Sequence, residues 1–156
     1  MADFDAFDRR ILAALQQDGR ITSVALADLV HLSASQCARR VQRLEETGAI
    51  RGYRAVLDAT ALGLGVSGVV NVSLEKHART NIQEFQCQVL ARPTIVECLS
   101  VTGDSDYQLR VVARDLQEFA ASLMESIVPM PGVSTTRSSV ILEHVKPMTG
   151  LPILES

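Results

Sequence analysis

The stretch 33–47 constrains this chain more than any other part of it. Its apolar residues Cys37, Val41 and Leu44 recur at helical spacing, so one side of a helix over this stretch is expected to be buried. The opposite side is polar and cationic, and it carries Ser35, Gln36, Arg39, Arg40 and Arg43. A charged helix face is often simply solvated, but a helix with a buried stripe and a cationic outer side also suits the major groove of DNA.

The start of this helix is marked by a capping box. Ser33 is followed three residues later by Gln36, a spacing at which each side chain can bond the other residue's backbone N–H. The positive end of such a helix attracts anions such as phosphate. Gln36 therefore has two competing roles, since a side chain that closes the capping box is less available to read adenine.

Two shorter helices are expected before it. The first covers residues 5–18 with Asp5 as its cap, and the second covers residues 23–30 with Thr22 as its cap. A short connection then leads into 33–47. Two helices joined by a tight turn, the second of them cationic, form a helix-turn-helix motif, here supported by a first helix.

Charge is distributed unevenly along the chain. The whole protein has a net charge of −3, which at first argues against a nucleic-acid partner. Residues 33–54, however, hold five arginines and two glutamates, a local charge of +3, whereas residues 55–156 carry −4. A local positive patch is what a phosphate backbone responds to, and Arg51 and Tyr53 are expected to reach flanking phosphates.

After residue 54 the hydrophobic pattern changes. Strands are expected at 66–75, 95–102, 107–113 and 134–142, and helices at 81–91 and 115–127. This β-α-β-β-α-β order is the ferredoxin-like arrangement, an antiparallel sheet with both helices on one face. Each helix is expected to turn an apolar face toward the sheet. These faces hold Ile82, Phe85, Val89 and Leu90 in the first helix and Leu116, Phe119, Leu123 and Ile127 in the second. A second copy of the sheet is expected to cover the other face, which predicts a dimer.

The predicted fold class is therefore α+β, with two domains. A helix-turn-helix DNA-binding domain covers 1–54, residues 55–65 are a linker, a ferredoxin-like effector-binding and oligomerisation domain covers 66–142, and 143–156 form a C-terminal tail without a clear pattern. A chain of 156 residues is long enough for two small domains.

Composition narrows the class of protein further. A hydrophobic content of 47% with mixed charges indicates a globular protein. There is no long apolar run and no signal peptide, so the chain is expected to be cytoplasmic and without a membrane partner. Cys37, Cys87 and Cys98 lack a C-x-x-C spacing and are expected to be buried small hydrophobic residues. The three histidines are scattered, and neither a metal site, a cofactor nor a catalytic group is predicted.

The order of short motifs resembles the leucine-responsive regulatory protein/AsnC (feast/famine) family of transcription regulators over nearly the whole chain. The matching segments are 5–12, 18–21, 32–33, 37, 39–41, 43–45, 48–53, 62–63, 102–104, 106–107 and 131–133. The resemblance implies dimers that often assemble further, symmetric sites on double-stranded DNA, and small effectors, commonly amino acids, bound where sensor domains meet.

The resemblance also implies an effector loop. Its residues are Thr102, Gly103, Asp104, Asp106 and Tyr107. The two carboxylates can hold an ammonium group and turn amides can hold a carboxylate, although glycine and aspartate also serve turn geometry alone. The chain departs from the family pattern at Ala34, where a proline is usual, and at Ser105 and Gln108 in and after the loop.

Two other functions remain open from the sequence. Sirohaem decarboxylases share this two-part architecture, but the chain has three dispersed histidines and no evident catalytic pair. An architectural DNA-binding protein of low sequence specificity is the other alternative, and it would return no motif in selected-site sequencing.

Overall fold

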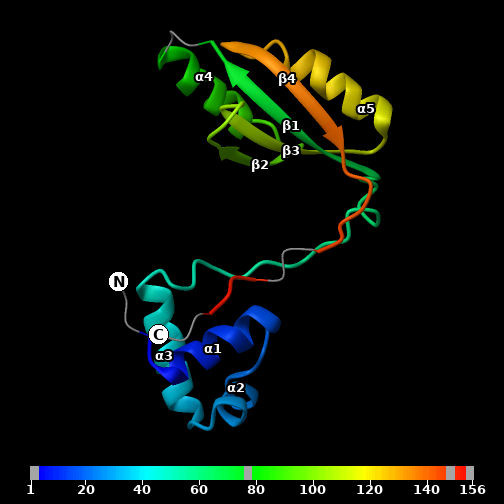
Figure 1. Cartoon of the computed structure of the whole chain (residues 1–156). Helices are drawn as coiled ribbons and strands as arrows, with labels where there is room; N and C mark the ends of the chain where they lie inside the picture. The colour runs from blue at the N-terminus through cyan, green and yellow to red at the C-terminus, as the bar shows by residue number, and fades with distance from the viewer. Residues whose placement is uncertain (1–3, 76–78, 147–149, 154–156) are drawn as a thin grey trace. The chain divides into compact units, whose positions relative to one another are not determined.

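A computed structural model describes residues 4–75, 79–146 and 150–153 of the chain (Figure 1). By their contacts the residues divide into a helical unit, residues 1–56 with 146–156, and a sheet unit, residues 57–145. The chain thus leaves the helical unit once and returns to it near its C-terminal end. None of the helices described in these ranges is long and apolar enough to cross a membrane.

The helical unit contains three helices, and each begins where the sequence predicts. They are α1 (Ala6–Gln17), α2 (Ser23–Val30) and α3 (Ala34–Glu46), with Asp5, Thr22 and Ser33 as their N-caps. Side chains from all three helices form one apolar core, made of Ile11, Leu26, Ala27, Val30, Cys37 and Leu44. The helix-turn-helix motif predicted from the capping and periodicity signals is therefore confirmed.

The turn between α2 and α3 is tight because of His31. Its φ of 59° lies in the left-handed region, and its backbone N–H donates to the carbonyl of Ala27. This conformation closes α2 and lets α3 begin three residues later. The left-handed backbone of His31 thereby sets the direction in which the chain enters α3.

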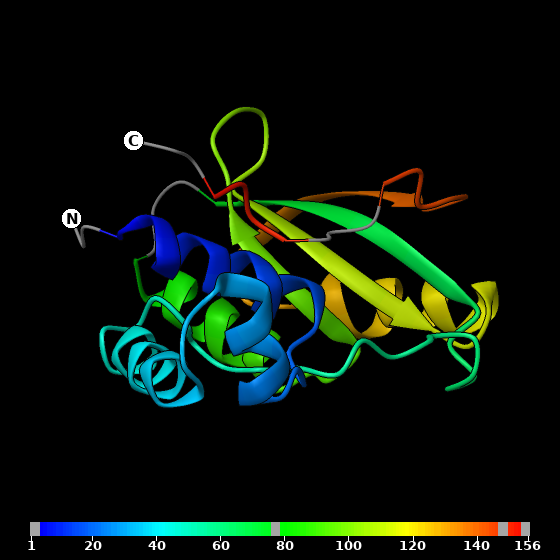
Figure 2. The same ribbon diagram turned by 90° about the horizontal axis from the view of Figure 1, so that it is seen from below.

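The sheet unit has the predicted β-α-β-β-α-β order. Its elements are β1 (Val66–Leu74), α4 (Arg79–Leu90), β2 (Ile95–Ser100), β3 (Tyr107–Ala113), α5 (Leu116–Ala121), the π-helical turn η1 (Ser122–Ile127) and β4 (Val133–Val140). The strands form an antiparallel sheet in the order β2-β3-β1-β4. Figure 2, turned by 90°, shows β1 and β3 side by side with the helices of this unit on one face of the sheet. The ferredoxin-like fold class is confirmed.

One face of this sheet is packed and the other is open. Val70, Val72, Leu109 and Val111 alternate along β1 and β3 toward the helices and are fully buried. Gly68 belongs to the same face, where an added Cβ would lie 2.4 Å from the Phe119 ring. The glycine therefore makes room for the aromatic ring that closes this end of the core.

Several expectations about individual side chains are wrong. Ile82, Leu90 and Leu116 are 39%, 85% and 61% exposed, because these helices reach the core through other residues, among them Phe85, Val89 and Phe119. Cys87 and Cys98 are exposed rather than buried, since Cys87 lies on the outer side of α4 and Cys98 on the edge strand β2. Only the prediction that Cys37 is buried is confirmed among the three cysteines.

Candidate DNA interface and effector site

The N-terminus of α3 is closed by the capping box that the sequence predicts. The Gln36 backbone N–H donates to Ser33 Oγ at 3.3 Å, and the Ser33 backbone N–H donates to Gln36 Oε1 at 3.1 Å. The Ser33 hydroxyl also donates to Gln36 Oε1 at 3.0 Å. The Gln36 oxygen is thus committed to the cap, and the exposed Ser35 hydroxyl lies in hydrogen-bond contact with Ser33 Oγ at 3.2 Å.

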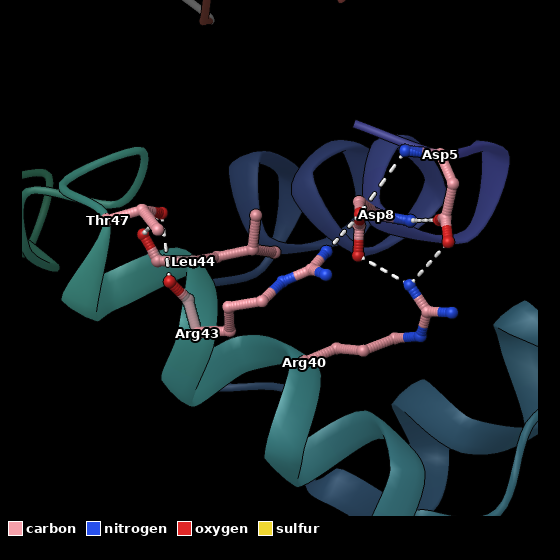
Figure 3. Close-up of polar contacts among 6 residues, drawn as sticks. All are labelled: Asp5, Asp8, Arg40, Arg43, Leu44 and Thr47. Carbon is pink, nitrogen blue, oxygen red and sulfur yellow. Dashed lines mark hydrogen bonds and ion pairs between the residues drawn. The ribbon is translucent and has the colours of Figure 1, made fainter. Parts of the chain in front are cut away.

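Two arginines of α3 are held by a buried carboxylate on α1, as Figure 3 shows. Asp8 is 0% exposed, and its Oδ1 accepts from Arg40 Nη1 at 2.7 Å. Its Oδ2 pairs with Arg43 Nη2 and also accepts from the Asp5 backbone N–H at 3.3 Å. Both oxygens of this carboxylate therefore have donors, which a buried charge requires.

Asp5 extends this cluster at the start of α1. Arg40 Nη1 bonds Asp5 Oδ2 at 2.7 Å, and the Arg40 guanidinium also lies 5.4 Å from the centre of the Phe7 ring. The backbone N–H of Asp8, together with Arg40, holds the pKa of the Asp5 carboxyl below its ordinary value. Hydrogen bonds to Asp5 and Asp8 in turn raise the pKa of Arg40. We call Asp5, Asp8, Arg40 and Arg43 the α1–α3 clasp.

The clasp separates the arginines that the sequence groups together. Arg40 and Arg43 both take part in it, with side chains 23% and 53% exposed. Arg39 is exposed, and among the residues described it has no carboxylate within ion-pair distance. All three arginines, with Gln42 and Glu46, still border one hollow of about 510 Å³. The side of α3 that bears these arginines is therefore cationic, but Arg40 and Arg43 are ion-paired with Asp8 whereas Arg39 is outside this ion pair.

Two residues of the segment after α3, Arg51 and Tyr53, differ in their contacts. Arg51 is exposed and lies in the segment that follows the helix. The Tyr53 hydroxyl donates to Glu45 Oε1 at 2.9 Å, and partial burial, with Glu45 beside it, raises the pKa of the Tyr53 phenol. Tyr53 therefore ties this segment back to α3, while Arg51 remains available to an outside anion.

The predicted effector loop lies between β2 and β3. Gly103 has a φ of 115°, a conformation that favours glycine, and open space surrounds it. Thr102 and Asp104 line a hollow of about 380 Å³ together with Asn71, Val101, Ser105, Gln108 and Arg137. The loop residues thus meet side chains from β1, β3 and β4 on the open face of the sheet.

Asp106 and Tyr107 do not line this hollow. Asp106 Oδ2 accepts from the Leu74 backbone N–H at 2.7 Å, so its carboxylate holds the loop against the end of β1. Tyr107 is 8% exposed, its hydroxyl accepts from Gln86 at 2.9 Å, and its ring lies 4.9 Å from that of Phe85. Tyr107 therefore belongs to the packed side of the sheet, whereas the exposed Asp106 carboxylate fixes the end of the loop.

A row of polar side chains crosses the open face next to the loop. Asn71 pairs in register with Gln108 of β3 and Arg137 of β4, and Gln108 Nε2 donates to Asn71 Oδ1 at 3.1 Å. Arg137 and Asp104 line the same hollow and carry opposite charges. Such a hollow suits a small zwitterion, whose ammonium and carboxylate need separate partners.

Sequence reasoning missed three of the residues that define these sites. No role is predicted for Asp8 from the sequence, although an acidic residue three positions after a cap is a signal for the capping box that it forms with Asp5. Asn71 and Arg137 were unremarkable in their strands. Strand alternation together with register places Gln108 and Arg137 on either side of Asn71.

The described residues contain no group of three or more His, Cys, Asp or Glu that is able to hold a metal ion.

A capped helix-turn-helix followed by a ferredoxin-like sheet with a polar hollow defines a DNA-binding regulator with a ligand-binding domain. Residues 4–45 match the AsnC-type helix-turn-helix domain, and residues 67–151 match the Lrp/AsnC ligand binding domain. The chain belongs to the Lrp/AsnC family of transcription regulators.

Individual relatives agree with this assignment. The chain is 40% identical over 144 residues to a leucine-responsive regulatory protein of Rhizobium meliloti, covering 92% of each protein. It is 38% identical over 151 residues to the leucine-responsive regulatory protein of Escherichia coli K12, covering 97% of this chain and 92% of the relative. A transcriptional regulator from Neisseria meningitidis, solved as an L-Met complex, superimposes with a TM-score of 0.93 at 34% identity, covering 97% of each chain.

Proposed function

We propose that this protein is a cytoplasmic regulator whose binding to specific DNA sites responds to a free amino acid. The single observation that carries the proposal is the hollow beside the Gly103 loop, where Asp104 and Arg137 offer opposite charges to one small molecule. The amino group of an amino acid would bind Asp104, and its carboxylate would bind Arg137. The relatives named for leucine and the neighbour solved with L-Met support this class of effector.

In the DNA interface, Ser35 and Arg39 are the side chains that read base edges. Both are exposed on α3, and Arg39 can form the two-bond contact to guanine. Arg43 and Arg51 contact phosphates, which position the helix without reading sequence. Gln36 stays in the capping box, and Arg40 orients α3 through the α1–α3 clasp. Tyr53 supports the segment that carries Arg51.

The functional assembly is a homodimer or a higher assembly of dimers. The open face of the sheet carries Val69, Leu99 and Val112 beside its polar row, and a second sheet would remove this surface from water. Two helix-turn-helix units would then bind a two-fold symmetric DNA site. The hollow borders this face, so an effector bound there would influence how subunits meet.

The effector assignment is tested with L-leucine and L-methionine as probes. Binding is measured by calorimetry on the parent protein and on Asp104→Asn and Arg137→Gln, with Glu97→Gln as the control on the same open face. We expect both hollow variants to weaken binding at least about tenfold, because each loses one charged hydrogen bond, while the control changes little. Equal affinity in all four proteins would contradict the proposed site.

The DNA assignment is tested by selecting sites from random duplexes. An enriched, two-fold symmetric motif is expected, and its loss in Arg39→Ala but not in Arg51→Ala would separate base reading from phosphate contact. Selection that returns no motif with the parent protein would favour the architectural alternative.

A further inference from the structure

The C-terminal segment 150–153 is held against α1 by a single glutamine side chain. The Leu151 backbone N–H donates to Gln16 Oε1 at 2.6 Å, and Gln16 Nε2 donates to the Leu151 carbonyl at 3.0 Å. An amide side chain offers this donor and acceptor side by side, so Gln16 pairs with the backbone as a neighbouring β-strand residue would. The two partners lie 135 positions apart in sequence.

Gly150 permits this close approach. Its φ is 135°, a region that side chains rarely adopt, and an added Cβ would lie 2.5 Å from Gln16 Oε1. A side chain at position 150 would therefore strain the backbone and push the Gln16 amide away from Leu151. Gly150 thus allows the Gln16 amide to reach both backbone groups of Leu151.

The segment also borders an apolar groove on the helical unit. This groove of about 640 Å³ lies between α1 and residues 49–56, and Leu12, Leu15 and Ile50 contribute apolar surface to its lining. Pro152 and Ile153 of the C-terminal segment line it as well. Ile153 is half-buried there, whereas Leu151 is 77% exposed and is held through its backbone.

We propose that this groove is a docking site for the chain's own C-terminal segment, with Gln16 as the residue that recognises it. The occupant is argued from the structure, in which residues 151–153 form one side of the groove and the Leu151 backbone bonds Gln16. Docking adds a second connection between the units, because the chain crosses between them at 56–57 and again at 145–146. Two attached chain segments allow the two units fewer relative positions than one linker would allow.

Docking attaches the C-terminal segment, which follows the sheet unit in the chain, to α1. The ion pairs of the clasp connect α1 to α3. A change in the sheet unit is thereby passed to the recognition helix along the C-terminal segment as well as along the linker. This consequence rests on the proposed DNA-binding and effector functions, whereas the docking itself does not.

The docking is tested by amide hydrogen exchange on the full chain, resolved to Leu151 by mass spectrometry with fragmentation. The Leu151 amide is expected to be protected in the parent protein and to exchange about tenfold faster or more in Gln16→Ala, which removes both hydrogen bonds. Gln17→Ala is the matched control, because Gln17 lies next in α1 and lines the same groove without bonding Leu151.

Unchanged labelling of buried Cys37 in Gln16→Ala would show that the helical unit remains folded, so that faster exchange reports loss of docking. Gly150→Ala is expected to have the same effect as Gln16→Ala because it displaces the backbone from Gln16. A Leu151 amide that exchanges as fast in the parent as in an unstructured peptide, or equally in parent and Gln16→Ala, would overturn the proposal.

A second experiment measures DNA affinity of the parent, Gln16→Ala and Gln17→Ala with and without L-leucine or L-methionine. Gln16→Ala is expected to keep its effector-free affinity within about threefold and to lose the effector-induced change. An undiminished effector response in Gln16→Ala would overturn the coupling role. A parent protein that binds no DNA would overturn the proposed function, while hydrogen exchange would still decide the docking.

Discussion

Replacing Arg40 and Arg39 separately by alanine tests whether neighbouring arginines of α3 have different tasks. Arg40 donates to two carboxylates, one of which, Asp8, is fully buried. Arg39 is exposed and outside the clasp. Arg40→Ala is therefore expected to destabilise the helical unit, whereas Arg39→Ala is expected to weaken DNA binding without altering stability.

The magnitude follows from what Asp8 loses. Removing one partner of a buried ion pair costs about 3–5 kcal/mol when the remaining charge has no other partner. Asp8 keeps Arg43 and the Asp5 backbone N–H, and Arg40 is itself partly exposed, so the cost is expected to be lower, about 2 kcal/mol. An exposed substitution such as Arg39→Ala typically changes stability by less than about 0.5 kcal/mol.

Cys37 provides the assay, because it is 0% exposed in the core of the helical unit while Cys87 and Cys98 are exposed. After the exposed thiols have reacted, slow labelling of Cys37 reports the opening of the helical unit alone. At fixed pH, 2 kcal/mol corresponds to about thirtyfold faster labelling in Arg40→Ala, against about twofold or less in Arg39→Ala. Equal Cys37 labelling in the two variants would refute the different roles assigned to these arginines.

Three further outcomes are expected. Gly68→Val should lower the stability of the sheet unit by about 1–3 kcal/mol in thermal unfolding, because the new side chain meets the Phe119 ring, whereas Ser67→Ala on the open face should have little effect. The Asp5 carboxylate, whose pKa is lowered on folding, stabilises the protein above its unfolded pKa of about 3.9, and this contribution is lost as the pH falls through the folded value. Asp5→Asn should therefore show a smaller acid-induced loss of helicity by circular dichroism, and an unchanged acid transition would contradict this. The logarithm of DNA affinity should fall linearly with the logarithm of salt concentration, with a slope about 1 unit shallower in Arg51→Ala; an unaltered slope would remove Arg51 from the phosphate contacts.

Local signals predicted most of the elements in this fold. Caps at Asp5, Thr22 and Ser33 gave the starts of the first three helices because a cap satisfies backbone groups next to it in sequence. Strand alternation likewise predicted β3 at residues 107–113. The exposed positions of Leu90 and Leu116 were not predicted, because periodicity gives the apolar side of a helix but not which residues of that side reach the core.

The roles of individual side chains were harder to predict for the same reason. The sequence predicts Arg40 and Arg43 as DNA contacts, but it gives no sign of their ion-pair partner Asp8, which lies more than thirty residues earlier. Asp106 looks like an effector ligand, yet its carboxylate bonds a backbone N–H of β1. Gln16 and Leu151 carry no signal at all, since a side-chain-to-backbone bond across 135 positions depends only on the folded path.

The clasp explains why an α1 residue matters for a helix that reads DNA. An apolar seam alone, such as Cys37 and Leu44 against the core, tolerates small rotations of α3 because dispersion and burial are not directional. The bonds from Arg40 and Arg43 to Asp8 are directional, and a rotation of α3 would separate a buried charge from its donors. The buried Asp8 carboxylate thus fixes the rotation of α3 about its axis, and that rotation sets the direction in which the exposed Arg39 side chain leaves the helix.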